Sequence, residues 1–278
     1  MKKIIIALLA IAAIAPTAYA RKKEAPKKIQ IVAHRGYWDC KEGQNAKNSI
    51  ASLKAAQKYG FWGSEFDVNM TRDGVLLVFH DGSVKIGDKK VRIDQNDYEV
   101  FKDYRLVNGE PIPTLPRYLA QARKSPKTRM IFEIKKHSTP ELERACVDRS
   151  IETLKEYGYF DPAKTIFISF SLNVCRYLTE VAPGFTVQYL DTDYTPDQIA
   201  ACGINGMDTE YNKIISDENW VKSAKSHGMS VNTWTVDKNA DMETVILRGV
   251  DQVTTNKPEE TRKVLKSMGL KEQKKSGK

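Results

Sequence analysis

The chain has 278 residues, of which 41% are hydrophobic and 28% charged, and its formal net charge is +9. This length and apolar content suit one large α/β domain or two smaller ones. No stretch after residue 20 approaches the roughly 20 apolar residues that a membrane span needs. Much of the excess positive charge lies near the two ends, without interleaved aromatic side chains, so the pattern argues against nucleic-acid binding.

The first 20 residues have the three parts of a secretory signal peptide. A basic pair at residues 2–3 precedes an apolar run at residues 4–14, and an A-x-A cleavage motif ends at Ala20. The apolar run is too short to span a membrane, and no cysteine directly follows it to accept lipid. We therefore expect cleavage after Ala20, a mature domain of residues 21–278 and a periplasmic or secreted location.

The four cysteines show neither a C-x-x-C pair nor a Cys/His zinc spacing. They are Cys40, Cys146, Cys175 and Cys202. Four cysteines allow three full disulfide pairings. We favour free or structural thiols, with Cys146 and Cys175 buried on helices.

Segments rich in β-branched and aliphatic residues alternate with amphipathic patterns along the rest of the chain. Strands are expected at residues 30–34, 64–70, 75–80, 129–135, 165–169, 186–190, 204–208, 230–236 and 250–254. Helices are expected at residues 49–58, 116–123, 140–156, 172–181, 196–201, 217–226 and 240–247. This alternation indicates βαβ units and a parallel sheet. With the chain length, it predicts an α/β fold of the (β/α)8 TIM-barrel type.

One expected strand is more than an eight-stranded barrel holds. Asp73-Gly74 is a strong signal for a two-residue hairpin turn. The strand at residues 75–80 is therefore expected to return beside the preceding strand, as an addition to the barrel. Counting back from a two-residue turn pairs Asp67 with His80.

A polar stretch follows this hairpin, at residues 85–113. We interpret it as a small insertion after the second-strand hairpin, more a lid than a domain. A helix of its own is expected around residues 94–104.

Charged side chains stand at the carboxyl ends of several expected strands, where barrel enzymes place their active sites. They are His34 and Arg35 after the first strand, Glu65 and Asp67 in the second, His80 at the end of the return strand, and Glu133 and Lys135 in the strand at residues 129–135. Residues two apart in a strand share a face. We therefore expect these side chains to meet at one mouth of the barrel.

Three of them, Glu65, Asp67 and Glu133, are hard oxygen donors. Three carboxylates close together cannot all stay ionised without a cation. Ca²⁺ or Mg²⁺ suits such a set, whereas zinc prefers His or Cys ligands. The sequence therefore predicts a divalent metal site.

The remaining charged residues suit chemistry on a phosphodiester. His34 and His80 can act as general acid and base. We take His34 as the base and His80 as the acid, an order that the sequence itself does not decide. Arg35 and Lys135 can hold phosphate oxygens.

Structural explanations apply to some of these residues and not to others. A lone histidine after a strand is more often structural than catalytic. We interpret His137 and His227 in this way, as an exposed loop residue and a helix-end residue. An acid inside an apolar strand is harder to explain, because burying an unpaired carboxylate is costly. Exposure at a sheet edge could account for acids in one of the two apolar strands but not in both.

A series of short motifs follows one order along the chain. They are Val32-Ala33-His34-Arg35-Gly36, Glu65-Phe66-Asp67-Val68 with Thr71-x-Asp73-Gly74, Val78-Phe79-His80-Asp81, Ile112-Pro113-Thr114-Leu115, Phe132-Glu133-Ile134-Lys135, Ser169-Phe170, Trp234-Thr235-Val236 and Gly249-Val250-Asp251. In this combination the chain resembles the glycerophosphodiester phosphodiesterase family, which is similar in fold to the phosphatidylinositol-specific phospholipases C.

The resemblance implies a TIM-type barrel, Ca²⁺ or Mg²⁺, and cleavage of a small glycerophosphodiester into glycerol 3-phosphate and an alcohol. It assigns His34 and His80 as the acid–base pair, Glu65, Asp67 and Glu133 as metal ligands, and Arg35 and Lys135 as phosphate-side residues. Attack by the glycerol 2-hydroxyl, through a cyclic phosphate, and direct attack by water both stay open.

Two segments depart from the family pattern. Ala46-Lys47-Asn48-Ser49 stands where Pro-Glu-Asn-Thr is usual, so a basic residue replaces an acid. Thr255-Asn256-Lys257-Pro258 stands where Thr-Asp-x-Pro is usual. Asn256 keeps the capability for a cap or turn but loses the charge. Neither change touches the expected chemistry.

Two other functions use the same residues. A phospholipase-C-like or cyclic-phosphate-forming enzyme on this barrel would need an apolar rim, for which Tyr37, Trp38, Phe61 and Trp62 are the suggestive aromatics. A secreted phosphodiester-binding protein without catalysis should have lost a histidine or a carboxylate. Both histidines and all three carboxylates are present, so the sequence favours an enzyme.

Overall fold

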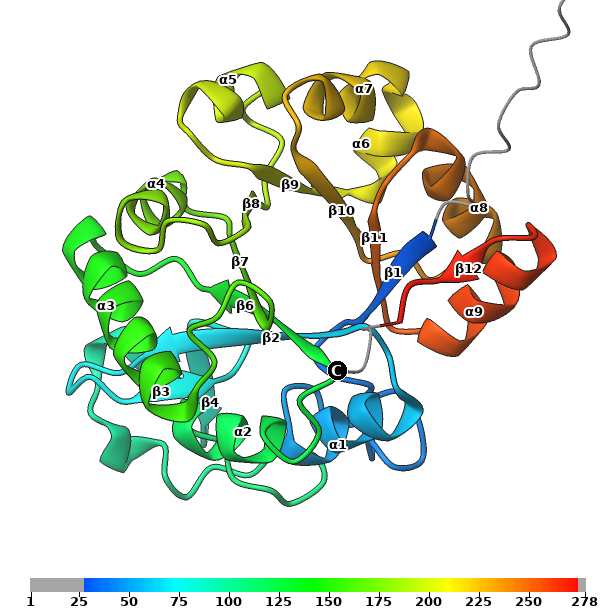
Figure 1. Cartoon of the computed structure of the whole chain (residues 1–278). Helices are drawn as coiled ribbons and strands as arrows, with labels where there is room; N and C mark the ends of the chain where they lie inside the picture. The colour runs from blue at the N-terminus through cyan, green and yellow to red at the C-terminus, as the bar shows by residue number, and fades with distance from the viewer. Residues whose placement is uncertain (1–27, 275–278) are drawn as a thin grey trace, which may run out of the picture.

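Eight parallel strands form a nearly closed barrel in the computed structural model, which describes residues 28–274 (Figure 1). They are β1 (Lys28–Ala33), β2 (Gly63–Met70), β6 (Arg129–Ile134), β7 (Thr165–Ser169), β8 (Val187–Tyr189), β9 (Gly206–Glu210), β10 (Ser230–Trp234) and β11 (Gln252–Thr255). The sheet order is β10-β9-β8-β7-β6-β2-β1-β11. Backbone hydrogen bonds from Asp251 to Val231 (2.8 Å) and from Val236 to Thr254 (3.1 Å) join β10 to β11. The predicted (β/α)8 barrel is confirmed.

Helices surround the barrel on its outside (Figure 1). They are α1 (Ile50–Tyr59), α2 (Leu115–Ala122), α3 (Pro140–Tyr157), α4 (Leu172–Val181), α5 (Pro196–Ala201), α6 (Tyr211–Ser216), α7 (Glu218–Ser226), α8 (Asn239–Arg248) and α9 (Pro258–Ser267). Seven of them match the expected helices. The helices α6 and α9 were missed. A short strand, β12 (Lys271–Glu272), pairs with β1.

The return strand β3 (Leu76–Val78) pairs antiparallel with β2, as an addition to the barrel. The predicted pairing of Asp67 with His80 is wrong, because Asp67 lies opposite Phe79, whose N–H donates to the Asp67 carbonyl at 2.9 Å. The turn contains three residues, 72–74, and Gly74 adopts φ +83°. A left-handed glycine closing a three-residue loop is a common hairpin form, and it shifts the register by one residue.

The insertion after this hairpin contains β4 (Ser83–Ile86), β5 (Lys89–Arg92) and the 3₁₀ helices η1 (Ile93–Gln95) and η2 (Tyr98–Val100). The single helix expected around residues 94–104 is therefore wrong. A small apolar cluster fills this region: Leu77, Val84, Ile93, Phe101 and Ile112. The Glu110 carboxylate accepts the backbone N–H groups of Ile50 and Ala51 at 2.9 and 3.1 Å. These bonds tie the insertion to the first turn of α1.

Strand alternation determines which side chains point into the barrel. Phe66 on β2 and Phe132 on β6 face the helices and stack on each other at 4.8 Å, and Phe167 on β7 continues the row. Because neighbouring residues in a strand point to opposite faces, Glu65 and Asp67 must point inward. The aromatic layer outside the barrel thus determines the direction of the acids inside it.

No helix within residues 28–274 combines the length and apolar character needed to cross a membrane. The predicted signal peptide lies outside the described residues. All four cysteines lie within the described range and are free, and Cys146 and Cys175 are buried on helices as predicted.

Replacing Phe132 by Ala should lower the free energy of unfolding by about 3–5 kcal/mol, because it leaves a cavity between two packed rings. Leu247→Ala, at a side chain that is 78% exposed, is the control and should change it by less than about 0.5 kcal/mol. Urea unfolding of the two variants measures both values. Equal effects would contradict this account of the core.

Candidate active site

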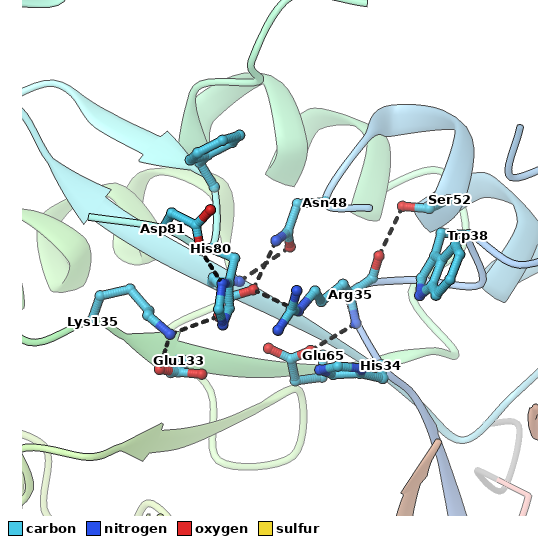
Figure 2. A network of polar contacts seen from close by, with 12 residues as sticks. His34, Arg35, Trp38, Asn48, Ser52, Glu65, His80, Asp81, Glu133 and Lys135 are labelled. Carbon is cyan, nitrogen blue, oxygen red and sulfur yellow. Dashed lines mark hydrogen bonds and ion pairs between the residues drawn. The ribbon is translucent and has the colours of Figure 1, made fainter. Parts of the chain in front are cut away.

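The strand ends bring the seven predicted site residues together at one mouth of the barrel, and Figure 2 labels all of them except Asp67. Five of them line a cavity of about 150 Å³: His34, Arg35, Glu65, His80 and Glu133. Asp67 and Lys135 lie beside this lining, since Asp67 pairs with Arg35 and Lys135 pairs with Glu133. The predicted convergence is therefore present in the structure.

Glu65, Asp67 and Glu133 form a compact acidic triad. Asp67 and Glu133 stand directly opposite each other on β2 and β6. The three side chains are almost fully buried, and each offers an oxygen within 4.8 Å of the other two. This spacing allows one cation to contact all three carboxylates.

Burial and mutual repulsion determine how the triad holds its protons. Burial raises the pKa of Glu65 well above its usual range, and the charges of Asp67 and Glu133 raise it further. Burial likewise raises the pKa of Glu133 to about 8. Without a cation, the three groups therefore resist ionising together. Hard, crowded carboxylates of this kind fit Ca²⁺ or Mg²⁺.

Asp67 is the anion that the site stabilises best. The Asn48 amide donates to its Oδ2 at 2.7 Å, and Lys135 Nζ donates to its Oδ1 at 3.2 Å. Burial alone would raise the pKa of Asp67, but the charge of Lys135, first among several favourable neighbours, holds it below its usual range. Lys135 Nζ also lies 2.6 Å from Glu133 Oε1. Asn48, matched to the family only by residue type, thus holds a site carboxylate.

Arg35 turns back over the acids through an unusual backbone. Its φ is +54° and that of Gly36 is +75°. A Cβ on Gly36 would lie 2.4 Å from Ser52 Oγ, so only glycine fits this turn. The Arg35 N–H donates to Glu65 Oε2 at 2.7 Å. Its Nε lies 3.7 Å from Asp67 Oδ2 and has no hydrogen-bond partner among residues 28–274.

A hydrogen-bond network fixes the tautomer of His34. Its Nδ1 lies 2.9 Å from Asn256 Oδ1, which also accepts from Trp38 Nε1 at 2.9 Å. The Asn256 amide nitrogen donates to Asp237 at 2.7 Å. An indole N–H only donates and a carboxylate only accepts, so the amide orientation is determined. His34 Nδ1 therefore carries hydrogen and its Nε2 keeps a free lone pair.

Burial and the neighbouring charge of Arg35 keep His34 neutral. Together they lower its pKa to about 4, although the hydrogen bond to Asn256 opposes this change. The sequence showed Asn256 only as a departure from the family pattern. Its contact with His34 joins residues 222 positions apart, so no local pattern could reveal it.

His80 has a different partner. Its Nδ1 lies 2.6 Å from Asp81 Oδ1, and its side chain is 40% exposed. Burial lowers the pKa of His80, while the charge of Asp67 and the hydrogen bond to Asp81 oppose that change. A carboxylate partner favours the protonated imidazole more than an amide does. Burial thus lowers the pKa of both histidines, but only His80 has a hydrogen-bonded carboxylate that opposes the change.

The other two histidines lie away from the cavity lining. The prediction of an exposed loop position is wrong for His137, which is 6% exposed. Its Nδ1 donates to the Lys135 carbonyl at 2.8 Å and its Nε2 accepts the Met70 N–H at 3.0 Å. It satisfies buried backbone groups at the ends of β6 and β2. His227 is exposed at the end of α7, as predicted.

One ionisable residue of the cavity lining was missed. Asp208 on β9 lines the cavity and is 1% exposed. Burial raises its pKa well above the usual range. The expected strand at residues 204–208 ended on this acid. The signal that singled out Glu133, an acid at the end of an apolar barrel strand, could therefore have found it.

Comparison with known proteins gives one consistent family. The model of the glycerophosphoryl diester phosphodiesterase family matches residues 34–260. A crystal structure of a glycerophosphodiester phosphodiesterase from Parabacteroides distasonis is 40% identical, with a TM-score of 0.82 over 88% of this chain and 100% of that one. The glycerophosphodiester phosphodiesterase of Caldanaerobacter subterraneus is 29% identical over 84% of this chain and 96% of its own length. The Bacillus subtilis enzyme of that name is 28% identical over 87% and 88%. The chain belongs to the glycerophosphodiester phosphodiesterase family.

Proposed function

We propose that this chain is an exported, metal-dependent enzyme that cleaves glycerophosphodiesters into glycerol 3-phosphate and an alcohol by acid–base catalysis with two histidines. The observation that carries the proposal is the convergence of His34, His80 and the acidic triad on one cavity. Export is supported by the signal-peptide pattern of residues 1–20. Family membership supports the substrate class.

Charge balance supports binding of a monoanionic diester beside a divalent cation. Three ionised carboxylates and the two cations Arg35 and Lys135 give a formal charge of −1 (−3 + 2). A divalent cation changes this to +1, which a phosphodiester neutralises. Arg35 is the stronger candidate for the phosphate, because its Nε lacks a hydrogen-bond partner in the described structure. When bound, Ca²⁺ or Mg²⁺ would stabilise charge on the phosphoryl oxygens and orient the substrate.

The hydrogen-bond partners support His34 as base and His80 as acid. His34 Nε2, unprotonated and neutral, would accept the proton of the attacking hydroxyl as its oxygen bonds to phosphorus. The bond from phosphorus to the alcohol oxygen then breaks, and His80 gives that oxygen a proton. Both the glycerol 2-hydroxyl and a water molecule suit this base. In the first case the roles reverse as water opens the cyclic phosphate.

Removal of the cation should abolish turnover, and Ca²⁺ or Mg²⁺ should restore it. Either cation should also raise the melting temperature of the cation-free protein, because binding to the native state alone stabilises it. Glu133→Gln removes one ligand and should weaken that stabilisation. Product assays and thermal unfolding, with and without chelator, measure both effects. Full turnover in excess EDTA after dialysis would overturn the metal assignment.

Replacing His34 or His80 by Ala should lower kcat by about 10²–10⁴-fold, the usual contribution of a positioned proton-transfer group. His227→Ala is the matched control, since His227 is exposed at the end of α7, and it should leave kcat unchanged. Thermal unfolding checks that each variant is folded. An active double variant at positions 34 and 80 would place the chemistry on other residues.

Exchanging the amide and the carboxylate of the Asn256–Asp237 pair places the carboxylate next to His34. This exchange should shift the dependence of kcat/KM on pH. In the double variant Asn256→Asp/Asp237→Asn, the new carboxylate favours protonated His34 and raises its pKa by about one unit or more. A base works only when unprotonated, so activity should be lost at a higher pH on acidification. The profile of kcat/KM against pH measures the shift.

Asp237→Asn alone is the control for this exchange, because it leaves an amide beside His34. Its acidic limb should stay at the wild-type position. Equal profiles for the wild type and the double variant would assign the acidic limb to a group other than His34.

A further inference from the structure

The part of the cavity lining that comes from β7 to β10, with β9 across the barrel from β2, is apolar except at Asp208. Met207 packs among the residues between barrel and helices, and Thr209 Oγ1 accepts the Trp220 indole N–H at 2.9 Å. Strand alternation therefore points Asp208 into the barrel. Its neighbours in the cavity lining include Ile168 on β7 and Leu190 after β8.

Asp208 Oδ1 has no hydrogen-bond partner among residues 28–274. The Trp234 indole donates to the Asp208 carbonyl at 3.1 Å and not to its side chain. The Asn232 amide, which donates to Thr254 Oγ1 at 2.9 Å, also lies close enough to the Asp208 carboxyl to oppose the rise of its pKa, but it leaves Oδ1 without a partner. Buried polar atoms in native proteins normally have a partner. A buried, unpaired oxygen on a cavity wall is therefore available to a ligand.

We propose that Asp208 binds the terminal hydroxyl of the glycerol half of the substrate and selects for it. This inference rests on the proposed function. Arg35, on the triad side, provides a position for the phosphate, and the glycerol chain then extends toward the opposite wall. The terminal hydroxyl is the glycerol oxygen farthest from phosphorus along that chain. A cavity of about 150 Å³ suits a group of this size better than an extended head group.

The chemistry of the wall suits a polyol. Carbon-bound hydrogens of glycerol would contact Ile168, Leu190 and Trp234, while the hydroxyl would pair with the carboxyl. A hydroxyl both donates and accepts, so it pairs with Asp208 in either protonation form. A diester that lacks this hydroxyl leaves Oδ1 unpaired, and sites built to bind a hydroxyl reject such analogues strongly. An acyl ester at the same position removes the donor and adds bulk, so the site should favour deacylated diesters over lysophospholipids.

The test compares two diesters of one alcohol. One carries glycerol, and the other carries a 2-hydroxyethyl group, which keeps the hydroxyl next to the phosphate ester and lacks only the terminal hydroxymethyl. The alcohol is the best substrate among choline, ethanolamine and inositol, because glycerol as the alcohol would leave a glycerol half in both diesters. Asp208→Leu should lower kcat/KM for the glycerol diester by about 10–100-fold. The same substitution should change kcat/KM for the 2-hydroxyethyl diester by less than about threefold, so the variant loses the wild-type preference for the glycerol diester.

Tyr159→Phe is the matched control, because it removes another buried side-chain oxygen without a partner, at a residue that does not line the cavity. The Tyr159→Phe variant should keep the wild-type preference for the glycerol diester. If Asp208→Leu impairs folding, Asp208→Ala and inhibition by glycerol 3-phosphate against 2-hydroxyethyl phosphate give the same comparison.

Equal losses on both diesters, or an unchanged preference, would overturn the role of Asp208. That result is distinct from a failure of the proposed function. If the wild-type enzyme with Ca²⁺ or Mg²⁺ cleaves no glycerophosphodiester, the proposed function and the role of Asp208 both fall. If the wild type turns over normally and Asp208→Leu keeps the preference for the glycerol diester, only the role of Asp208 is overturned.

Discussion

Mutual repulsion among three buried carboxylates is the constraint on which this site depends. Glu65, Asp67 and Glu133 are withdrawn from water and held close together by adjacent strands. Nothing in their own chemistry favours that arrangement. It is imposed by the packing of Phe66 and Phe132 outside the barrel, because a one-residue slip would exchange the acids for the aromatic rings. The apolar layer therefore supplies the free energy that holds the acids together.

The surrounding cations and amides distribute charge unevenly over the site. Lys135 bonds to Asp67 and lies against Glu133, whereas Glu65 takes a backbone N–H of Arg35. The histidines extend this asymmetry, since His34 faces a neutral amide and His80 faces a carboxylate. Burial lowers the pKa of both histidines, and only at His80 does a hydrogen-bonded carboxylate oppose that lowering. In the proposed mechanism, this difference suits His34 to the role of base and His80 to that of acid.

Much of the fold and of the candidate site could be predicted from the sequence, because the residues that determine them lie close together along the chain. Acids two apart in an apolar strand must share a face, and barrel strand ends must meet at one mouth. The hairpin register failed because one left-handed glycine, Gly74, adds a residue to the turn. The burial of His137 depends on backbone groups of two strands. Long-range contacts of this kind leave no periodic signal in the sequence.

In the proposed mechanism, one half of the barrel supplies the chemistry and the other half recognises the substrate. The predicted site residues come from β1, β2, β6 and the end of the β3 return strand, whereas Ile168, Leu190, Asp208 and Trp234 come from the β7–β10 half. Substitutions in the second half can reshape the wall that meets the substrate without moving the acidic triad. In such a barrel the reaction can stay fixed while the accepted substrate changes. An acid left unpaired among apolar side chains is then best explained by the ligand that it meets.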